Sequence, residues 1–487
     1  MGMSNDVNLN SQIKTGLVWN FLERGGLQIV TFVVQLILAR LLTPEDYGIL
    51  AIVSIFISFS STFVNNGLAN AVVQKKNSDS KDFNTVFYFQ LAVAVVFVFI
   101  LWVVAPWIAI YYDNSNLTVY LRVMSLTLLI DAFYSMQVVK LKINMQFKKA
   151  FFANVAGIFA QAIVGVSMAM AGCGVWSLIV SQLVQKGVLL LVLIALVRWL
   201  PRLEFSFARL KKLFGYSWKL FVGWIIGTVH QDIYAFIIGT YFPTETLGHY
   251  NRASSLPQTI TKTVNESVSN VMFPALSKLQ DERDLFKQNT RQMMALLCFL
   301  IWPIVAGIAA VSESFVMVIL TDKWAPSIPM MQLFSLTYGF NVISTANMQP
   351  YNAIGRSDIF MKLEIVKRSI SIALLLIATV WIGNIYAVIG AITIMGLFSV
   401  CCNIVLNCKL LDYNLKEQIC DMCPPFIISI TMFIMVYAMN LLDISYQVKL
   451  IVQIFAGIVI YFGLSVLFHL PAMRMAINFL KSFVKGK

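Results

Sequence analysis

The stretch WNFLERGGLQIVTFVVQLILARLLTPEDYG, residues 19–48, starts like a membrane span and yet carries charge. A helix of about 20 apolar residues crosses the roughly 30 Å hydrocarbon core of a bilayer. Glu23 and Arg24 lie inside this segment, although a charge at the bilayer centre costs about 2.5–3.5 kcal/mol on insertion scales. The segment therefore predicts a membrane helix whose polar side faces protein or a water-filled cavity.

The composition of the whole chain is also that of a membrane protein. Hydrophobic residues make up 59% of the 487 residues, charged residues only 12%, and the mean hydropathy is +0.78. A soluble domain carries about 25% charged residues. Apolar runs of about 20 residues recur from end to end, and each is long enough to span a bilayer. We therefore expect an all-α polytopic membrane protein.

Several kinds of site are not expected. The polar start of the chain and the length of its first apolar run argue against a cleavable signal peptide. Most of the seven cysteines lie in apolar runs, and Cys408, Cys420 and Cys423 have no fourth ligand nearby, so no zinc site is predicted. The phosphate-binding, serine-hydrolase and zinc-protease motifs do not occur. We expect no cofactor, no metal and no enzymatic activity.

Fourteen segments are predicted to form membrane helices. The eighth is too polar for a hydropathy window to detect. The predicted helices run over residues 17–41, 47–73, 83–111, 117–139, 149–172, 175–197, 214–241, 247–273, 289–311, 328–353, 360–382, 385–407, 419–441 and 447–469.

Basic residues favour one orientation in the membrane. With a cytoplasmic N-terminus, the outer loops hold only Arg40, Lys323 and Lys449, and the other loop lysines and arginines lie inside. This is a strong positive-inside bias. It requires the eighth helix, because without it every later loop would change side. We predict that both termini are cytoplasmic, and we attribute the formal net charge of +13 to topology rather than to nucleic-acid binding.

The chain also contains an internal repeat. LLTPEDYG (41–48) matches YFPTETLG (241–248), and Gly16 and Trp19 match Gly215 and Trp218 at an offset of 199 residues. The repeat predicts an N-terminal lobe (1–200, helices 1–6), a C-terminal lobe (201–410, helices 7–12) and a last part (411–487) with helices 13 and 14 and a cytoplasmic tail. In transporters built from such repeats, substrate sites lie between the repeats.

Polar residues share one face of the first two helices of each lobe, at spacings of three and four. The second helix carries Ser54, Ser58, Ser61 and Asn65 in this way. Lys186, in the middle of the sixth helix, cannot easily extend to either membrane surface. We predict a central aqueous cavity with an excess of positive charge. Its candidate substrate-binding residues are Asn20, Arg24, Gln28, Arg122, Lys186, Lys219, His230, Arg252 and Lys262.

Four carboxylates inside the predicted helices are candidates for ion coupling. They are Glu23, Asp131, Asp232 and Glu266. Glu23 and Arg24 do not pair with each other, since adjacent helical residues do not face each other. The alternative is that the charged groups pair across a closed interface, for example Lys262 with Glu266, or Arg122 with Asp131 or Glu23.

Three segments resemble a known family. LARLLTPEDYG (38–48), NNGLANAVVQ (65–74) and LGHYNRA (247–253) are similar to signatures of Wzx-type bacterial polysaccharide flippases. These flippases belong to the multidrug/oligosaccharidyl-lipid/polysaccharide exporter superfamily, and the colanic-acid and teichuronic-acid subgroup is the most similar. The resemblance implies two six-helix lobes and alternating access.

The resemblance also implies a substrate and a place in the cell. The substrate is an oligosaccharide on undecaprenyl pyrophosphate, moved from the cytoplasmic to the outer leaflet of the bacterial cytoplasmic membrane for O-antigen, capsule or exopolysaccharide synthesis. Membrane lipid and the polymerase and chain-length proteins of the pathway are the implied partners. In related peptidoglycan-precursor flippases a first-helix arginine and a groove of helices 13 and 14 serve the substrate. Arg24 matches that arginine, and the cationic cavity would offset the pyrophosphate.

Two other functions were considered. A cation-coupled multidrug exporter of the same superfamily predicts twelve helices and a cavity with carboxylates. A polysaccharide polymerase or ligase predicts a large outer loop with Arg, His and Glu, whereas the longest outer loop here, 312–327, is short. The fourteen spans and the basic excess favour the flippase.

Overall fold

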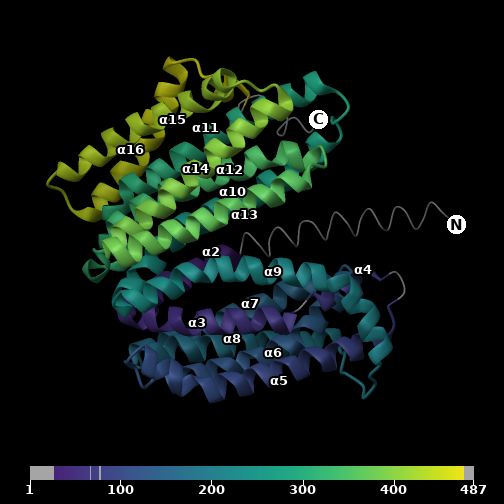
Figure 1. The fold of residues 1–487 in the computed structure, drawn as a ribbon. Helices are drawn as coiled ribbons and strands as arrows, with labels where there is room; N and C mark the ends of the chain where they lie inside the picture. The colour runs from purple at the N-terminus through teal and green to yellow at the C-terminus, as the bar shows by residue number, and fades with distance from the viewer. Residues whose placement is uncertain (1–26, 66, 76–77, 476–487) are drawn as a thin grey trace. The chain divides into compact units, whose positions relative to one another are not determined.

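The computed structural model describes residues 27–65, 67–75 and 78–475, and in these ranges it contains helices and no strand (Figure 1). Fourteen long helices follow the predicted spans in order, so the all-α class is confirmed. One short helix, α4, follows α3. The helices are α2 (Leu27–Leu41), α3 (Pro44–Asn65), α4 (Leu68–Gln74), α5 (Ser80–Tyr111), α6 (Leu117–Ile143), α7 (Phe147–Met170), α8 (Val175–Val197), α9 (Phe207–Tyr241), α10 (Thr244–Ser277), α11 (Arg283–Phe315), α12 (Ser327–Ala353), α13 (Ser357–Leu376), α14 (Ile385–Leu411), α15 (Leu415–Ala438) and α16 (Tyr446–Leu467).

Eleven helical ranges of the described residues are long and apolar enough to cross a membrane. The long helices outside this set are α2, α10 and α12, and in α2 the segment Val30–Leu41 is a shorter apolar helix. α10 is the polar eighth helix that the charge distribution required. It forms one continuous helix of 34 residues despite Pro257 and Pro274.

Local chemistry explains where the helices begin. At the start of α3, the Thr43 hydroxyl accepts a hydrogen bond from the Asp46 amide (3.2 Å), and the Asp46 carboxylate accepts one from the Thr43 amide (2.8 Å). Pro44 occupies the first turn, where a missing N–H costs nothing. This reciprocal arrangement is a capping box. α3 ends where Gly67 takes a positive φ of 76°, which glycine adopts without strain.

The chain divides into two compact units, residues 1–248 and 249–487. In the first unit, α9 packs against α3, α4 and α5. In the second unit, α11 packs against α12, α15 and α16. The lobes of the internal repeat were predicted with a boundary at residue 200. That boundary concerns sequence similarity, and it stays a prediction.

The matched motifs of the repeat meet in the first unit. A Cβ atom built on Gly48 would lie 1.9 Å from the carbonyl oxygen of Thr244, and one built on Gly248 would lie 1.8 Å from that of Pro44. The first turns of α3 and α10 therefore touch backbone to backbone. Only glycine permits this approach, because any side chain at either position would overlap the opposite backbone.

Candidate functional site

A polar seam runs along α3 in the first unit. We define it by Ser58, Ser61, Thr62 and Asn65 of α3 and by their partners Asp131 (α6), Lys186 (α8), Thr228 and Asp232 (α9). The α3 residues share a face because they are three or four positions apart. The seam thus contains three charged residues that the sequence analysis selected: Asp131, Lys186 and Asp232.

Direct hydrogen bonds join the helices across the seam. Asn65 Nδ2 donates to Ser61 Oγ (3.1 Å), and Ser61 Oγ donates to Asp131 Oδ2 (3.4 Å). Ser58 Oγ donates to the Asp232 carboxylate, and the hydroxyls of Thr62 and Thr228 lie 3.0 Å apart. Two residues of the predicted polar face of the second helix, Ser58 and Ser61, are therefore bound to carboxylates of α9 and α6.

Lys186 and Asp131 form an ion pair in the middle of their helices. The Lys186 ammonium lies 2.8 Å from each Asp131 carboxylate oxygen. Lys186 is midway along α8 and Asp131 is near the middle of α6. Both ends of these helices are therefore more than about 15 Å away at 1.5 Å per residue. The pair is a neutral unit deep inside the membrane region.

The other predicted cavity residues of the first unit lie elsewhere. Arg122 donates to the carbonyl oxygen of Trp102 (3.2 and 3.1 Å) and lies over the ring of that tryptophan, where α5 meets α6. Lys219 is exposed near Trp218, and His230 lies edge-on to Tyr234. Gln28 is exposed on α2. Asn20, Glu23 and Arg24 lie outside the described residues.

Three predicted residues lie on α10 in the second unit. Arg252 is buried, whereas Lys262 and Glu266 are exposed. Within each unit the structure therefore brings together only part of the predicted set. The substrate-binding role of these residues stays a prediction.

The second unit contains an apolar groove between α11, α15 and α16. Its volume is about 410 Å³. Gly307 and Gly457 leave room in its walls, and Gln453 is the one polar side chain among the lining residues. The Tyr461 hydroxyl also lines the groove, but it donates to the carbonyl oxygen of Phe299 (2.7 Å) and is thereby satisfied. The groove suits a hydrocarbon chain and offers no site for an ion.

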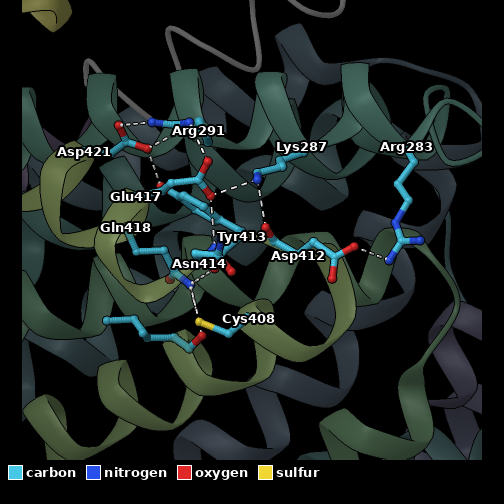
Figure 2. A network of polar contacts seen from close by, with 11 residues as sticks. Arg283, Lys287, Arg291, Cys408, Asp412, Tyr413, Asn414, Glu417, Gln418 and Asp421 are labelled. Atoms are coloured by element: carbon cyan, nitrogen blue, oxygen red, sulfur yellow. Dashed lines mark hydrogen bonds and ion pairs between the residues drawn. The ribbon is translucent and has the colours of Figure 1, made fainter.

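A network of ion pairs joins α11 and α15, two of the three helices that line the groove (Figure 2). Arg291 of α11 donates two hydrogen bonds to Asp421 of α15 (2.7 and 3.0 Å) and one to Glu417 (3.1 Å). Lys287 lies 2.8 Å from Glu417, and the Tyr413 hydroxyl donates to Asp421 (2.7 Å). The network fixes α15 against α11 and so maintains the wall of the groove.

A pocket of about 380 Å³ lies beside this network, and its lining charges are nearly balanced. Two cations, Lys287 and Arg291, face three carboxylates, Asp284, Glu417 and Asp421. Because the cations already have carboxylate partners, this pocket is not an anion site.

A second ion-pair cluster lies at the start of α5 in the first unit. Asp82 is buried and contacts Lys75 and Arg209, the latter at 3.2 Å. Arg209 also donates to Asp79, and this hydrogen bond holds the pKa of Asp79 well below its usual range. The cluster ties the end of α4 and the start of α5 to α9.

The sequence analysis missed one buried polar cluster in the second unit. Lys367 pairs with Glu364 and donates to Ser399 Oγ (3.1 Å), which lies 2.7 Å from Ser344 Oγ. The only sequence signal was a Glu and a Lys three residues apart inside an apolar run. The described residues contain no group of three or more His, Cys, Asp or Glu side chains arranged for a metal.

Fold and site together define a class of protein. The described residues form fourteen long helices in two units, with a charged pair at mid-depth in one unit and an apolar groove in the other, and this is the architecture of a polytopic membrane transporter. Its spans cross the membrane many times, and the charged pair at mid-depth is satisfied within the protein.

The chain belongs to the polysaccharide biosynthesis protein family, whose model matches residues 37–329. It is 21% identical to the teichuronic acid biosynthesis protein TuaB of Bacillus subtilis, covering 94% of this chain and 96% of the relative. It is 20% identical to the lipopolysaccharide biosynthesis protein WzxC of Escherichia coli, covering 89% of each. The succinoglycan biosynthesis transport protein ExoT of Rhizobium meliloti is 26% identical over 66% of this chain. The resemblance seen in the motifs is thereby confirmed.

Solved structures of other membrane proteins have the same fold. The lipid II flippase MurJ in an inward closed conformation matches with a TM-score of 0.72 at 16% identity, over 93% of this chain and 98% of MurJ. An inward-facing multidrug transporter of the MATE family matches with a TM-score of 0.55 at 14% identity, over 80% of this chain and 96% of the transporter. These likenesses establish the fold.

Proposed function

We propose that this protein flips lipid-linked oligosaccharides across the membrane for polysaccharide biosynthesis. It is a multi-pass membrane transporter and not an enzyme. Family membership supports the pathway, and the names of its relatives include a transport protein and a Wzx protein. The observation that carries the proposal is the apolar groove formed by α11, α15 and α16, because a polyprenyl carrier needs a protein surface for its hydrocarbon chain.

The groove and the polar interior bind different parts of the substrate. The polyprenyl chain lies along the groove, whose lining is apolar except for Gln453 and the satisfied Tyr461 hydroxyl. The pyrophosphate is neutralised by cations inside the membrane region, for which Arg24 and Lys186 are the candidates. Charge-assisted hydrogen bonds to phosphate are about twice as strong as neutral ones. Alternating access then carries the headgroup from the cytoplasmic to the outer leaflet.

The finer assignments belong to the same proposal. Both termini are cytoplasmic, and the membrane is the bacterial cytoplasmic membrane. The protein delivers its product to the polymerase and chain-length proteins of the pathway. The positive-inside bias of the loops supports the orientation.

A cation-coupled exporter is the second candidate, because Asp131 and Asp232 lie inside the membrane region. Asp131 is already neutralised by Lys186, so Asp232, which accepts a hydrogen bond from Ser58, is the carboxylate available to such an exporter. Membership of the polysaccharide biosynthesis family and the Wzx relative favour the flippase.

A glycine substitution in the groove tests the proposal. Gly307 lines the groove, and a Cβ there would meet no atom within 4 Å, so Gly307→Leu adds side-chain volume at the groove wall from an open position. We expect the variant to be folded and inserted, and lipid-linked oligosaccharide to accumulate on the cytoplasmic leaflet of a deletion strain carrying it. The measurement is the amount of lipid-linked intermediate accessible on each face of the membrane.

The matched control is Gly463→Leu on α16. A Cβ at Gly463 also meets no atom within 4 Å, but the residue does not line the groove. This variant should flip normally. Normal flipping by well-expressed Gly307→Leu would exclude the groove as the prenyl site. Absence of any cytoplasmic accumulation in the deletion strain itself would refute the flippase function.

A further inference from the structure

The seam contains an ion pair whose two partners were expected to have separate roles. We propose that Asp131 and Lys186 form an exchangeable pair that couples headgroup binding to proton uptake. When the pyrophosphate of the carrier lipid enters, Lys186 leaves Asp131 for the phosphate, and Asp131 takes a proton from water. The inference rests on the proposed flippase function and adds a coupling ion to it.

Lys186 is the main group that stabilises the ionised form of Asp131. The ammonium lies 2.8 Å from each carboxylate oxygen. The other contact of this carboxylate is the long 3.4 Å hydrogen bond from Ser61. Among the described residues, the Lys186 ammonium in turn donates its hydrogen bonds to Asp131. Moving Lys186 therefore leaves the Asp131 carboxylate with one weak donor.

The Lys186 side chain is more exposed than that of Asp131, as the exchange requires. The Lys186 side chain is 35% exposed and that of Asp131 is 13% exposed. The Glu364–Lys367 pair of the second unit is a useful contrast, since the Lys367 side chain is 8% exposed and also donates to Ser399. Lys186 is accessible to an entering anion, whereas Lys367 is enclosed as a structural pair.

Among the described residues, Lys186 is the cation that contacts Asp131. Among the described residues packed against α6 and α8, the charged side chains of α3, α5 and α7 lie at the helix starts, and α4 has none. On α6 itself, Arg122 is bound to the Trp102 carbonyl oxygen, Lys140 of the last turn lies over the rings of Phe83 and Trp199, Lys142 is in the same turn, and Tyr134 lies one turn from Asp131. Asp232 of α9 accepts from Ser58. Without Lys186, the Asp131 carboxylate thus has no cation in contact with it among the residues that the structure describes.

The exchange keeps the charge inside the membrane region balanced. Before binding, the Lys186 ammonium offsets the Asp131 carboxylate. After binding, the same ammonium offsets one phosphate charge, and Asp131 is neutral because an O–H bond has formed between a carboxylate oxygen and a proton from water. An isolated carboxylate in a low-dielectric interior takes up a proton rather than remain charged. One proton enters with each headgroup and leaves when the headgroup leaves.

The exchange predicts a definite pH dependence of binding. Because binding takes up a proton, the affinity for the headgroup rises as the pH falls, by up to about tenfold per pH unit for one proton. The phosphate groups of the ligand also titrate. Their contribution is the same for every variant, so the difference between variants isolates Asp131.

The experiment uses the full chain in nanodiscs with undecaprenyl pyrophosphate as the probe, and measures Kd across neutral pH. We expect Asp131→Asn to bind at least as tightly as the wild type and to lose the extra pH dependence, because Lys186 is then always available. Lys186→Gln should bind more weakly. The exposed pair Arg356 and Asp358 provides the control, and Arg356→Gln with Asp358→Asn should leave Kd and its pH dependence unchanged.

The double variant Asp131→Asn with Lys186→Gln separates exchange from a structural role. It leaves no charge to bury, so a structural pair predicts a folded protein with wild-type binding. The exchange predicts a folded protein that has lost both affinity and the extra pH dependence. Equal pH slopes for the wild type and Asp131→Asn, or wild-type binding by the double variant, overturns the exchange and leaves the flippase function intact. Failure of the wild type to bind the probe overturns both.

Discussion

Replacing Gly48 by alanine tests the backbone contact between the first turns of α3 and α10. The new Cβ would lie 1.9 Å from the Thr244 carbonyl oxygen and 2.7 Å from its carbonyl carbon, whereas ordinary contact begins at 3.4 Å. The two segments must therefore separate by about 1.5 Å, which is the difference between 3.4 and 1.9 Å. Rotation of a side chain cannot relieve the overlap, because the obstructing atoms are backbone.

The cost follows from known cases of overpacking. Inserting a methyl into a close-packed contact costs about 1–3 kcal/mol. A free-energy change of this size shifts a two-state equilibrium by about 5- to 150-fold. We therefore expect Gly48→Ala to favour conformations in which these two helix starts are apart. The better helix propensity of alanine offsets up to about 1 kcal/mol of the cost.

The assay is thiol labelling of a cysteine at position 247 in a protein without other cysteines. Leu247 is fully buried next to this contact, so its labelling rate reports separation. We expect Gly48→Ala and Gly248→Ala each to raise that rate. Gly187→Ala should leave it unchanged, since a Cβ there meets no atom within 4 Å.

The double variant sharpens the test. One separation accommodates both methyl groups, so Gly48→Ala with Gly248→Ala should cost less than the sum of the single changes. A wild-type labelling rate in a well-folded Gly48→Ala protein would refute the reasoning, because it would mean that the contact relaxes without separation of the helices.

Three further predictions concern the groove wall, the headgroup and the topology. Arg291→Lys should lower the stability by about 2 kcal/mol, because lysine cannot reproduce the two hydrogen bonds to Asp421; thermal unfolding in detergent measures this, and an unchanged melting temperature contradicts it. Arg24→Ala should abolish export while leaving the protein inserted, and full export by a well-expressed variant would exclude a binding role. Cysteines placed near Asp113 should react with an impermeant reagent from outside and those near Lys148 should not; the reverse pattern would invert the topology.

The helices could be predicted because their signals are local. Apolar runs mark the spans, and the Thr43–Asp46 capping box with Pro44 marks the start of α3. The polar helix α10 escaped hydropathy, but the distribution of lysine and arginine required it. The repeat likewise identified Gly48 and Gly248 as matching positions, without indicating that the two segments touch.

The ion-pair partners of charged residues could not be predicted from local signals. The sequence analysis considered Arg122 as a partner for Asp131, and the structure instead pairs Asp131 with Lys186, 55 residues away. Arg122 lies against Trp102. Periodicity places Asp131 and Arg122 on α6, but it does not indicate which neighbouring helix covers each side of α6.

The chain by itself therefore determined the all-α class, the order of the helices and the polar face of α3, since each depends on residues within a few turns of one another. Only the tertiary structure decided that Lys186 neutralises Asp131, that α11, α15 and α16 enclose a groove, and that Gly48 meets Thr244. The physical reason is that a spacing of three or four residues defines a face of one helix. Which faces meet depends on how side chains from distant segments pack together, and that packing is decided by the whole unit at once.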